Sequence, residues 1–544
     1  MLDSNQKLKK MNFKNISRKV AAVLAISSIT LSSCVNDLDT EPIDPNATTA
    51  NKVFADPANY INALAKLYAG FTLSGQQGPT GNPDIKFLDE GHGQYLRGYY
   101  VLQELPTDEA INGWNDGNLP RISQMTWQAN NEFIRAFYYR AIYQVSLANE
   151  FLRNVPADGE VNGIQFSTMR AEARFIRAFA YWHALDLFGN GVPFVTEGDP
   201  VGAFLPNPAG LPGWGSDRRE LFDFIVSEVK EIETMLPEPR TGELGRADKG
   251  AAYMLLSKLY LNAETYTGTA MWSEAEAELN KLVASGAYTL NPSYKGMFSA
   301  DNHTSTETIF SFNFNALNTQ TFGGMTYMIH AAVGGSMSAA DFGINSGWGG
   351  NRALRELNAK FVDGADLRGP GELLTVGDDG GDIDDQFKFT QGYFVRKFTN
   401  NNADGTAISN PDPNGDHVDT DFPTFRYSDA VLMLAEAELK GSGSVSGGTL
   451  ALINQIRTRA GVGTVTPTEV NSGLWILDER ARELYWECHR RTDLIRWGQY
   501  TSGANWQYKG GTVNGTSVAD YHRLMPIPSS DLNANPNLKQ NEGY

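Results

Sequence analysis

Cysteine, histidine and long hydrophobic runs are scarce in this sequence. Only Cys34 and Cys488 are cysteines, and seven histidines are scattered singly along 544 residues. The phosphate-loop motifs G-x-G-x-x-G and G-x-x-x-x-G-K-[ST] do not occur, and neither do H-E-x-x-H or G-x-S-x-G. Beyond residue 31, no apolar run approaches the 18 residues that a membrane-spanning helix needs. Nothing therefore indicates a nucleotide-binding, zinc-protease or serine-hydrolase site, and with Cys34 assigned to lipid (below) no disulfide is expected.

Positive charge is also in deficit. Six of the 45 Lys and Arg residues, but one of the 63 Asp and Glu residues, lie in residues 1–33. The rest of the chain therefore carries 39 basic and 62 acidic residues, a formal charge of −23. Such a surface repels nucleic acid and anionic lipid headgroups. We expect no nucleic-acid partner, and any membrane contact must come from a lipid.

The N-terminus has the pattern of a bacterial lipoprotein signal. A basic stretch is followed by the apolar run Val20–Leu31, which is too short to cross a bilayer, and then by Ser32-Ser33-Cys34. This pattern predicts cleavage after residue 33 and lipidation of Cys34, with Met1 or Met11 as the start. Residues 34–50 are acidic, contain two prolines and lack periodicity, so we expect a flexible tether.

Helical periodicity dominates the chain from Val53 onward. Apolar residues recur at steps of three and four in the following segments: Glu132–Val155, Ser167–Phe188, Glu220–Leu236, Ala247–Ala263, Trp272–Ser285, Asp429–Lys440 and Gly448–Ala460. Several of these form consecutive pairs, as in tetratricopeptide units. We predict a mainly α fold with a tetratricopeptide-like helix-pair scaffold, long irregular loops and short β-strands such as Thr308–Phe314 and Tyr393–Phe398.

Paired carboxylates leave two other kinds of site open. Asp89-Glu90, Asp108-Glu109 and the Asp-rich segment Asp378–Asp385 are the main clusters. A glycoside hydrolase needs two carboxylates across a cleft, and Asp-rich loops can hold calcium, although no EF-hand spacing is present. In so acidic a chain, solvated loops explain these clusters more simply. We expect no enzyme activity and no cofactor, with calcium as the one option.

Three tryptophans stand in Gly/Asn contexts that neither helix nor strand favours. They are Trp114 (INGWNDGN), Trp214 (LPGWGSD) and Trp348 (NSGWGGN). One such ring is more often a plug for a local hollow, but three favour a surface on which a ligand stacks. Sugar rings stack on indole through their C–H faces and need Asn, Asp and Arg beside them. Nucleic-acid bases stack similarly but require a basic groove.

Three long segments carry a family resemblance. Arg170–Glu197 (RAEARFIRAFAYWHALDLFGNGVPFVTE), Glu479–Gly498 (ERARELYWECHRRTDLIRWG) and Leu524–Tyr544 resemble signatures of the SusD/RagB family of Bacteroidota surface lipoproteins. The resemblance runs from the lipoprotein cysteine to the end of the sequence. It implies a SusD-like fold in one intertwined unit, with an N-terminal region at 51–240 and a C-terminal region at 241–544.

Shorter motifs are similar to the starch-binding founder of that family. They are DEGHGQYLR, ELPTDE, GRADK and GGTVNGTSV. By this likeness, Trp114, Phe322 and Trp348 take the places of the founder's three aromatic residues, and Arg97 that of its arginine. The asparagine place falls at Gly117, with Asn118 beside it, and Phe322 replaces a tyrosine. We expect the three rings to converge into one bowed surface open to solvent.

The resemblance implies a function. The expected protein captures α-glucan, such as starch or maltooligosaccharide, at the outer membrane and delivers it to a TonB-dependent, SusC-like transporter. Two alternatives remain: a surface glycoside hydrolase, and a lipoprotein of the same fold that takes up another glycan or a peptide.

The charges of Glu479–Gly498 have a structural interpretation. Glu479, Arg480, Glu483, Glu487 and Arg490 recur at steps of three and four, which predicts ion pairs that lock one helix against the scaffold. Cys488 would lie within this helix, at a place where the family usually has glycine.

Overall fold

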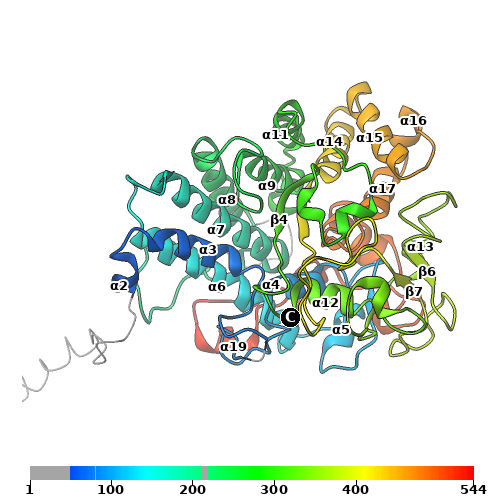
Figure 1. Cartoon of the computed structure of the whole chain (residues 1–544), viewed down its shortest axis with the longest axis horizontal. Coiled ribbons are helices and arrows are strands. Elements are labelled where there is room, and N and C mark those ends of the chain that lie inside the picture. The colour runs from blue at the N-terminus through cyan, green and yellow to red at the C-terminus, as the bar shows by residue number, and fades with distance from the viewer. Residues whose placement is uncertain (1–49, 80, 211–217) are drawn as a thin grey trace, which may run out of the picture. The chain divides into compact units, whose positions relative to one another are not determined.

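Helices dominate the computed structural model, which describes residues 50–79, 81–210 and 218–544 (Figure 1). Residues 57–544 form one compact unit. Its longer helices are α3 (Asn59–Ala69), α4 (Tyr95–Gln103), α6 (Glu132–Asn154), α7 (Phe166–Phe188), α8 (Arg219–Ile232), α9 (Lys249–Leu261), α11 (Trp272–Ala284), α14 (Tyr427–Ser442), α15 (Gly447–Arg459) and α17 (Trp475–Leu484). The shorter ones are α2 (Ala50–Phe54), which precedes the unit, α5 (Leu119–Ser123), α10 (Ala263–Thr267), α12 (Gly324–His330), α13 (Arg355–Asn358), α16 (Pro467–Val470), α18 (Arg490–Arg496) and α19 (Ser529–Ala534). The predicted mainly α class is confirmed.

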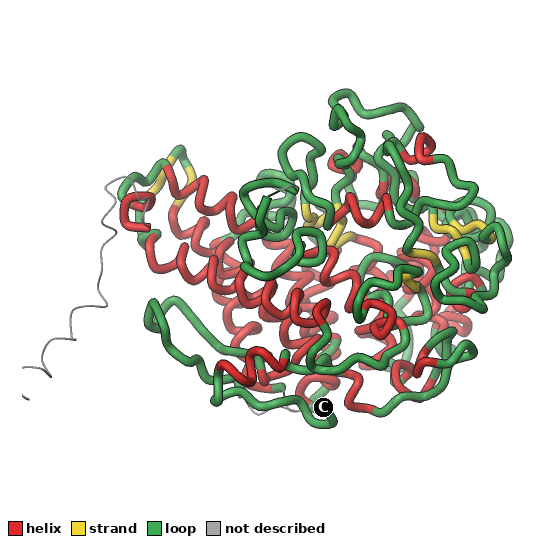
Figure 2. Tube along the Cα trace, turned by 90° about the horizontal axis from the view of Figure 1, so that it is seen from below, coloured by secondary structure: helices red, strands yellow, loops and turns green. Residues whose placement is uncertain are grey.

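The predicted helix pairs form a continuous layer. α6 packs on α7, α7 on α8, α8 on α9, α9 on α11, α11 on α14, and α14 on α15. Figure 2 shows a group of long helices running side by side in one half of the unit, while loops with shorter helices predominate in the other half. Their bounds differ by a few residues from those predicted, because apolar periodicity marks the buried face and not the last hydrogen bond. Asn131 caps α6, its Oδ1 accepting from the amides of Phe133 and Ile134 at 3.0 and 3.3 Å.

The loops contain short strands. The described strands form two-stranded antiparallel sheets, and these are β1 (Ile111–Asn112) with β5 (Asn351–Arg352), β2 (Glu160–Val161) with β3 (Ile164–Gln165), β4 (Thr308–Phe312) with β8 (Phe422–Arg426), and β6 (Leu374–Val376) with β7 (Tyr393–Val395). Phenylalanines of β4 and β8 join the helical layer. The ring of Phe179 on α7 lies 5.7 Å from those of Phe310 and Phe425, so the sheet and the helices share one aromatic core.

The segment Glu479–Gly498 does not form the single helix that we predicted. α17 ends at Leu484 and α18 begins at Arg490. Between them Trp486 and Cys488 have φ values of 64° and 65°, in the left-handed region. Cys488 therefore lies in a turn and not within a helix, which explains why glycine suits this place. The charged residues recur at steps of three and four although a turn divides the segment, because those on both sides of the turn belong to the same ion-pair network.

The predicted ion pairs are present and buried. Glu483 contacts Arg368 at 3.0 Å, Arg426 at 2.7 Å and Arg459. Glu487, inside the turn, contacts Lys397 and Arg426, each at 2.6 Å. The arginines around Glu483 hold the pKa of its carboxyl far below its usual range, although burial alone would raise that pKa. The network ties loops from the second half of the chain to the helices.

The ELPTDE motif belongs to this network. Glu104 accepts hydrogen bonds from the amides of Cys488 and His489 at 2.5 and 3.2 Å, and Asp108 binds Arg490 at 2.7 Å. The motif follows α4, a fully buried helix that is absent from the segments predicted by apolar periodicity. It leads directly into β1, so the network also fixes the loop that begins after β1.

Candidate functional site

Three rings from distant loops meet at one surface, as expected. Trp114, Phe322 and Trp348 are each partly exposed. The ring centroids of Phe322 and Trp348 lie 6.3 Å apart with planes at 56°, and those of Trp348 and Trp114 lie 6.5 Å apart with planes at 42°. We call these three residues the ring arc. Because neighbouring rings are tilted, the arc presents a bowed surface and not a flat one.

Strand pairing brings the two indoles together. In the β1–β5 sheet, Asn112 is paired with Asn351, and the amide of Gly113 donates to the carbonyl of Gly350 at 2.9 Å. The Trp114 Nε1 donates to the carbonyl of Gly349 at 3.2 Å. A Cβ on Gly350 would lie 2.5 Å from the Trp114 ring, so glycine is required for this close approach. The neighbouring indole thus explains Gly350, whereas a Cβ on Gly347 would lie 2.3 Å from the carbonyl oxygen of Val333 and Gly349 has a φ of 60°.

The helix α12 sets the positions of Phe322 and Trp348. Phe322 lies just before its N-terminus, and its amide donates to Glu90 at 3.0 Å. At the C-terminus, the amide of Trp348 donates to the carbonyl of His330 at 2.8 Å, and the amides of Gly350 and Asn351 donate to that of Ala331 at 2.8 and 2.7 Å. These carbonyls have no partner within the helix. The loop that carries Trp348 is therefore fastened to the helix end.

Arg97 lies beneath the arc. Its residue is 7% exposed, and its guanidinium carbon lies 4.3 Å from the ring centroid of Tyr327 and 5.7 Å from that of Trp114. Its Nη1 donates to the carbonyl of Phe322 at 3.3 Å. Burial lowers the pKa of Arg97 from its ordinary value, while nearby carboxylates act in the opposite direction. Arg97 thus contacts the Trp114 ring and the Phe322 carbonyl from below, and only a small part of its side chain is accessible to a ligand.

Asn118 is engaged by a neighbouring acid. Its Nδ2 donates to Glu132 at 2.7 Å and its backbone amide to the same carboxylate at 2.8 Å. These bonds, with desolvation opposing them, lower the pKa of Glu132. A Cβ on Gly117 would lie 2.1 Å from an oxygen of this carboxylate, so an asparagine at that place would displace the Glu132 side chain. One of the two side-chain N–H groups of Asn118 is thus hydrogen-bonded within the protein and is not available to a ligand.

Two residues behind the arc were missed from the sequence. The ring of Tyr327 meets that of Trp114 edge-on at 5.8 Å, and His330 stacks on Trp348 at 4.7 Å with planes at 29°. Both belong to α12, three residues apart and hence on one face. The spacing of three residues between Tyr327 and His330 is visible in the sequence GMTYMIH, but a helix of two turns is too short to be predicted from apolar periodicity. Burial lowers the pKa of His330, so the ring behind Trp348 is neutral.

The paired carboxylates have structural partners. Asp108 and Glu109 are buried in the ion-pair network, and Glu90 accepts from Ser74 and Thr321, each at 2.6 Å. In the Asp-rich segment, Asp378 accepts from the amide of Ser336 at 2.8 Å. Among the residues that the structure describes, no group of three or more His, Cys, Asp or Glu side chains is placed to hold a metal ion. The calcium option thus has no support there.

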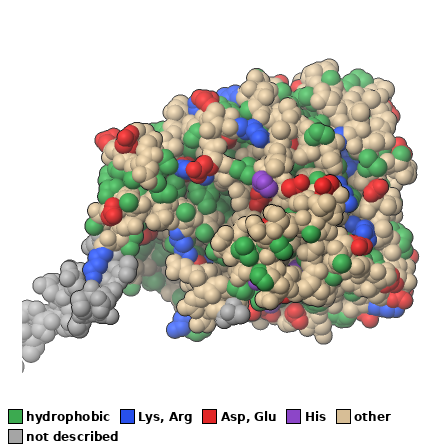
Figure 3. Space-filling model, in the orientation of Figure 1, with side chains coloured by type: hydrophobic (Ala, Val, Ile, Leu, Met, Phe, Trp, Pro, Cys, Tyr) green, Lys and Arg blue, Asp and Glu red, His purple; other side chains and the backbone are tan. Residues whose placement is uncertain are grey.

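Residues 1–49, with the expected signal, Cys34 and most of the tether, lie outside the described part of the chain, as does Trp214. No helix in the described residues is long and apolar enough to span a membrane. On the face in Figure 3, the Lys and Arg side chains are isolated among acidic and neutral ones, with no basic groove on that face.

The fold and the arc define a class: a tetratricopeptide-like scaffold whose loops bring three partly exposed aromatic rings together. Sequence comparison agrees. Residues 339–544 match the profile of the SusD family, and residues 97–261 match that described as starch-binding associating with outer membrane. The starch-binding protein SusD of Bacteroides thetaiotaomicron is 33% identical over 96% of this chain and 98% of its own length. The chain belongs to the SusD family.

Solved structures share the fold at low identity. A SusD-like carbohydrate binding protein from Bacteroides fragilis superposes with a TM-score of 0.69 at 20% identity, covering 90% of this chain and all of that one. Surface glycan-binding protein A from Bacteroides thetaiotaomicron, solved with laminarihexaose, has a TM-score of 0.67 at 19% identity, covering 89% of this chain and 99% of that one. The predicted SusD-like fold is confirmed.

Proposed function

We propose that this protein captures an α-glucan on the ring arc and passes it to a TonB-dependent outer-membrane transporter. The observation that carries the proposal is the convergence of Trp114, Phe322 and Trp348, at centroid distances of 6.3 and 6.5 Å. Partly exposed rings with polar neighbours suit the C–H faces and hydroxyls of sugars. The rigid fastening of the arc to α12 and β1 lowers the entropy that binding must overcome.

The tilt between neighbouring rings favours a curved glycan over a straight one. Helical α-glucans such as starch are curved, and the relative at 33% identity is named for starch binding. One structural neighbour was solved with laminarihexaose, a β-1,3-linked glucan that also coils. Curvature alone does not separate these two, so laminarihexaose is the comparison ligand for any binding measurement.

Capture without cleavage is part of the proposal. Asp108, 4% exposed, and Glu109, 1% exposed, face arginine and backbone partners and not an open cleft. Incubating the protein with maltoheptaose and separating the products tests this point, because a hydrolase would release shorter chains. We also propose that lipid on Cys34 holds the protein at the outer face of the outer membrane, since the acidic chain gives no electrostatic attraction to lipid.

Trp348 is the residue to change, because it contacts both other rings. Replacing a tryptophan at the centre of a binding surface typically costs about 2–3 kcal/mol, or about 30- to 150-fold in Kd. We therefore expect Trp348→Ala to weaken maltoheptaose binding by that factor in isothermal titration calorimetry, with the unfolding temperature little changed.

The matched control is Trp475→Ala, which removes another partly exposed indole, one that contacts Arg457 and Arg482 on the helical side. It should bind as the unchanged protein does. Equal affinity in Trp348→Ala and the unchanged protein would refute the arc as the binding surface. Binding of laminarihexaose but not maltoheptaose would keep the arc and change the glycan.

A further inference from the structure

A second open cleft lies apart from the ring arc. Its volume is about 640 Å³, within the usual range for small-molecule sites. It is lined by residues 125–129, which follow α5, by Gly510 with residues 516–519 and 521–522, and by residues 543–544. We call it the C-terminal cleft. It shares no lining residue with the arc.

The side chains that line the C-terminal cleft are uncharged. None of them is Asp, Glu, Lys or Arg, although charged residues make up 20% of the chain. The one titratable imidazole is His522, and burial lowers its pKa, so it is neutral near pH 7. An ionic ligand would find no side-chain counter-charge in this lining. The cleft therefore suits a neutral ligand.

Aromatic rings form one wall and are held in place. The Trp127 Nε1 donates to the Tyr544 hydroxyl at 2.7 Å, which donates to the carbonyl of Leu524 at 2.6 Å. Tyr521 lies edge-on to Tyr544 at 4.8 Å and is partly exposed. Among the described residues its hydroxyl has no recorded hydrogen-bond partner, so it can bind a ligand. The wall combines a fixed aromatic surface with a free hydroxyl.

Small polar groups line the cleft together with the rings. Thr516 and Ser517 are exposed at the edge of the cleft, and Thr126 and Gln128 add a hydroxyl and an amide. Aromatic rings beside hydroxyls and amides, without charge, are the groups that recognise a neutral sugar. We propose that the C-terminal cleft is a second carbohydrate site, which binds a neutral oligosaccharide. The choice of glycan as ligand class rests on the proposed function.

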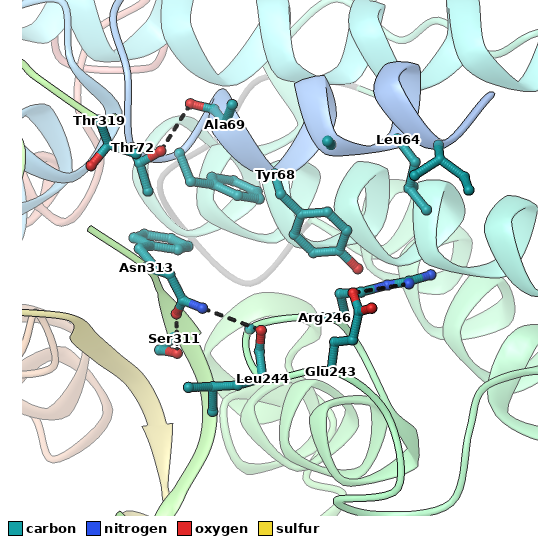
Figure 4. Close-up of a pocket in the computed structure, with 15 residues that line it drawn as sticks. Leu64, Tyr68, Ala69, Thr72, Glu243, Leu244, Arg246, Ser311, Asn313 and Thr319 are labelled. Atoms are coloured by element: carbon teal, nitrogen blue, oxygen red, sulfur yellow. Dashed lines mark hydrogen bonds and ion pairs between the residues drawn. The ribbon is translucent and has the colours of Figure 1, made fainter. Parts of the chain in front are cut away.

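A hollow of about 320 Å³ beneath α3 offers a contrast (Figure 4). There the polar side chains already pair with the protein: Arg246 binds Glu172, and the Asn313 Nδ2 donates to the carbonyl of Leu244 at 3.2 Å. A ligand would gain little beyond apolar contact in that place. The C-terminal cleft differs because it keeps unused hydroxyls next to its rings.

Hydrogen–deuterium exchange with millimolar maltoheptaose tests the second site. In the Trp348→Ala chain, we expect slower exchange in residues 125–129 and 510–523, since the C-terminal cleft remains intact. With Trp348 in place, Tyr521→Ala should abolish the protection of residues 125–129 and 510–523 and leave the protection around residues 322 and 348. Because Tyr521→Ala could loosen the wall, Ser517→Arg serves as a second variant: it places a bulky side chain at an exposed position on the edge of the cleft.

The outcomes separate the two proposals. Protection of the arc alone, at any maltoheptaose or laminarihexaose concentration, overturns the second site and leaves the proposed function standing. Protection of residues 510–523 that disappears in Trp348→Ala also overturns it, because the effect then comes from the arc. If neither region is protected by either glucan, the proposed function fails, and with it the ligand class assigned to the cleft.

Discussion

The close contact between Gly350 and Trp114 allows a test of the ring arc in which none of its three aromatic residues is replaced. In Gly350→Ala, the new Cβ would lie 2.5 Å from the Trp114 Cε2 and 2.8 Å from Cζ2 and Nε1. Ordinary contacts between such atoms need about 3.5 Å, so the indole must retreat by about 1 Å. The movement also strains its hydrogen bond to the carbonyl of Gly349, now 3.2 Å long.

The cost falls on binding more than on folding. Overpacking typically costs about 1–3 kcal/mol when a side chain cannot move, but Trp114 is partly exposed and can swing outward. One displaced ring then removes about 1–2 kcal/mol of stacking and contact, or about 5- to 30-fold in Kd. We expect this loss for maltoheptaose in calorimetry, with a small change in unfolding temperature.

Two comparisons make the result specific. Gly364→Ala is the control, because a Cβ there meets nothing within 4 Å; it should bind normally. In a Trp114→Ala background, Gly350→Ala should have no further effect on affinity, because the ring that the new Cβ displaces is gone. A folded Gly350→Ala protein with unchanged affinity would show that the position of Trp114 does not matter to binding, and the reasoning would be wrong.

Two further predictions concern stability. Glu483→Gln removes the charge that three buried arginines share, and should lower the free energy of unfolding by about 3–5 kcal/mol in urea titrations. The control is Glu238→Gln at an exposed ion pair, which should lower the free energy of unfolding by less than about 1 kcal/mol. Equal losses in the two variants would contradict a stabilising role for the buried ion-pair network. Burial raises the pKa of Asp421 to about 7, so this group contributes stability at low pH that is lost as pH rises from about 4 through 7. Asp421→Asn can keep the 2.8 Å bond from the amide of Phe314, and should gain stability over the unchanged protein at pH 8 but not at pH 4; a pH-independent difference would refute the assignment.

The sequence predicted the scaffold well because long helices repeat their apolar pattern many times. α6 and α7 were placed within one or two residues. The turn at Trp486 and Cys488 was missed because left-handed residues other than glycine leave no compositional mark. α4 was missed because its burial on every side removes the polar face that periodicity needs.

The candidate site was predictable in part. Tryptophans between glycines and asparagines indicated exposed rings, and the family resemblance added Phe322, which has no such context. The depth of Arg97 and the engagement of Asn118 by Glu132 could not be predicted, because both depend on neighbours more than ten residues away in the sequence. Tyr327 and His330 were overlooked for the same reason: their role follows from the rings that lie over them.

The fastening of the Trp348 loop to the end of α12 restricts how this surface can diversify. The amides of Trp348, Gly349 and Gly350 donate to the carbonyls of His330, Val333 and Ala331, and that of Asn351 also donates to Ala331, so an inserted or deleted residue between 346 and 351 would shift these amides away from their carbonyls. Substitution of one ring for another keeps every backbone bond. Related proteins that change their preferred sugar should therefore vary in ring identity and hold the length of this loop constant.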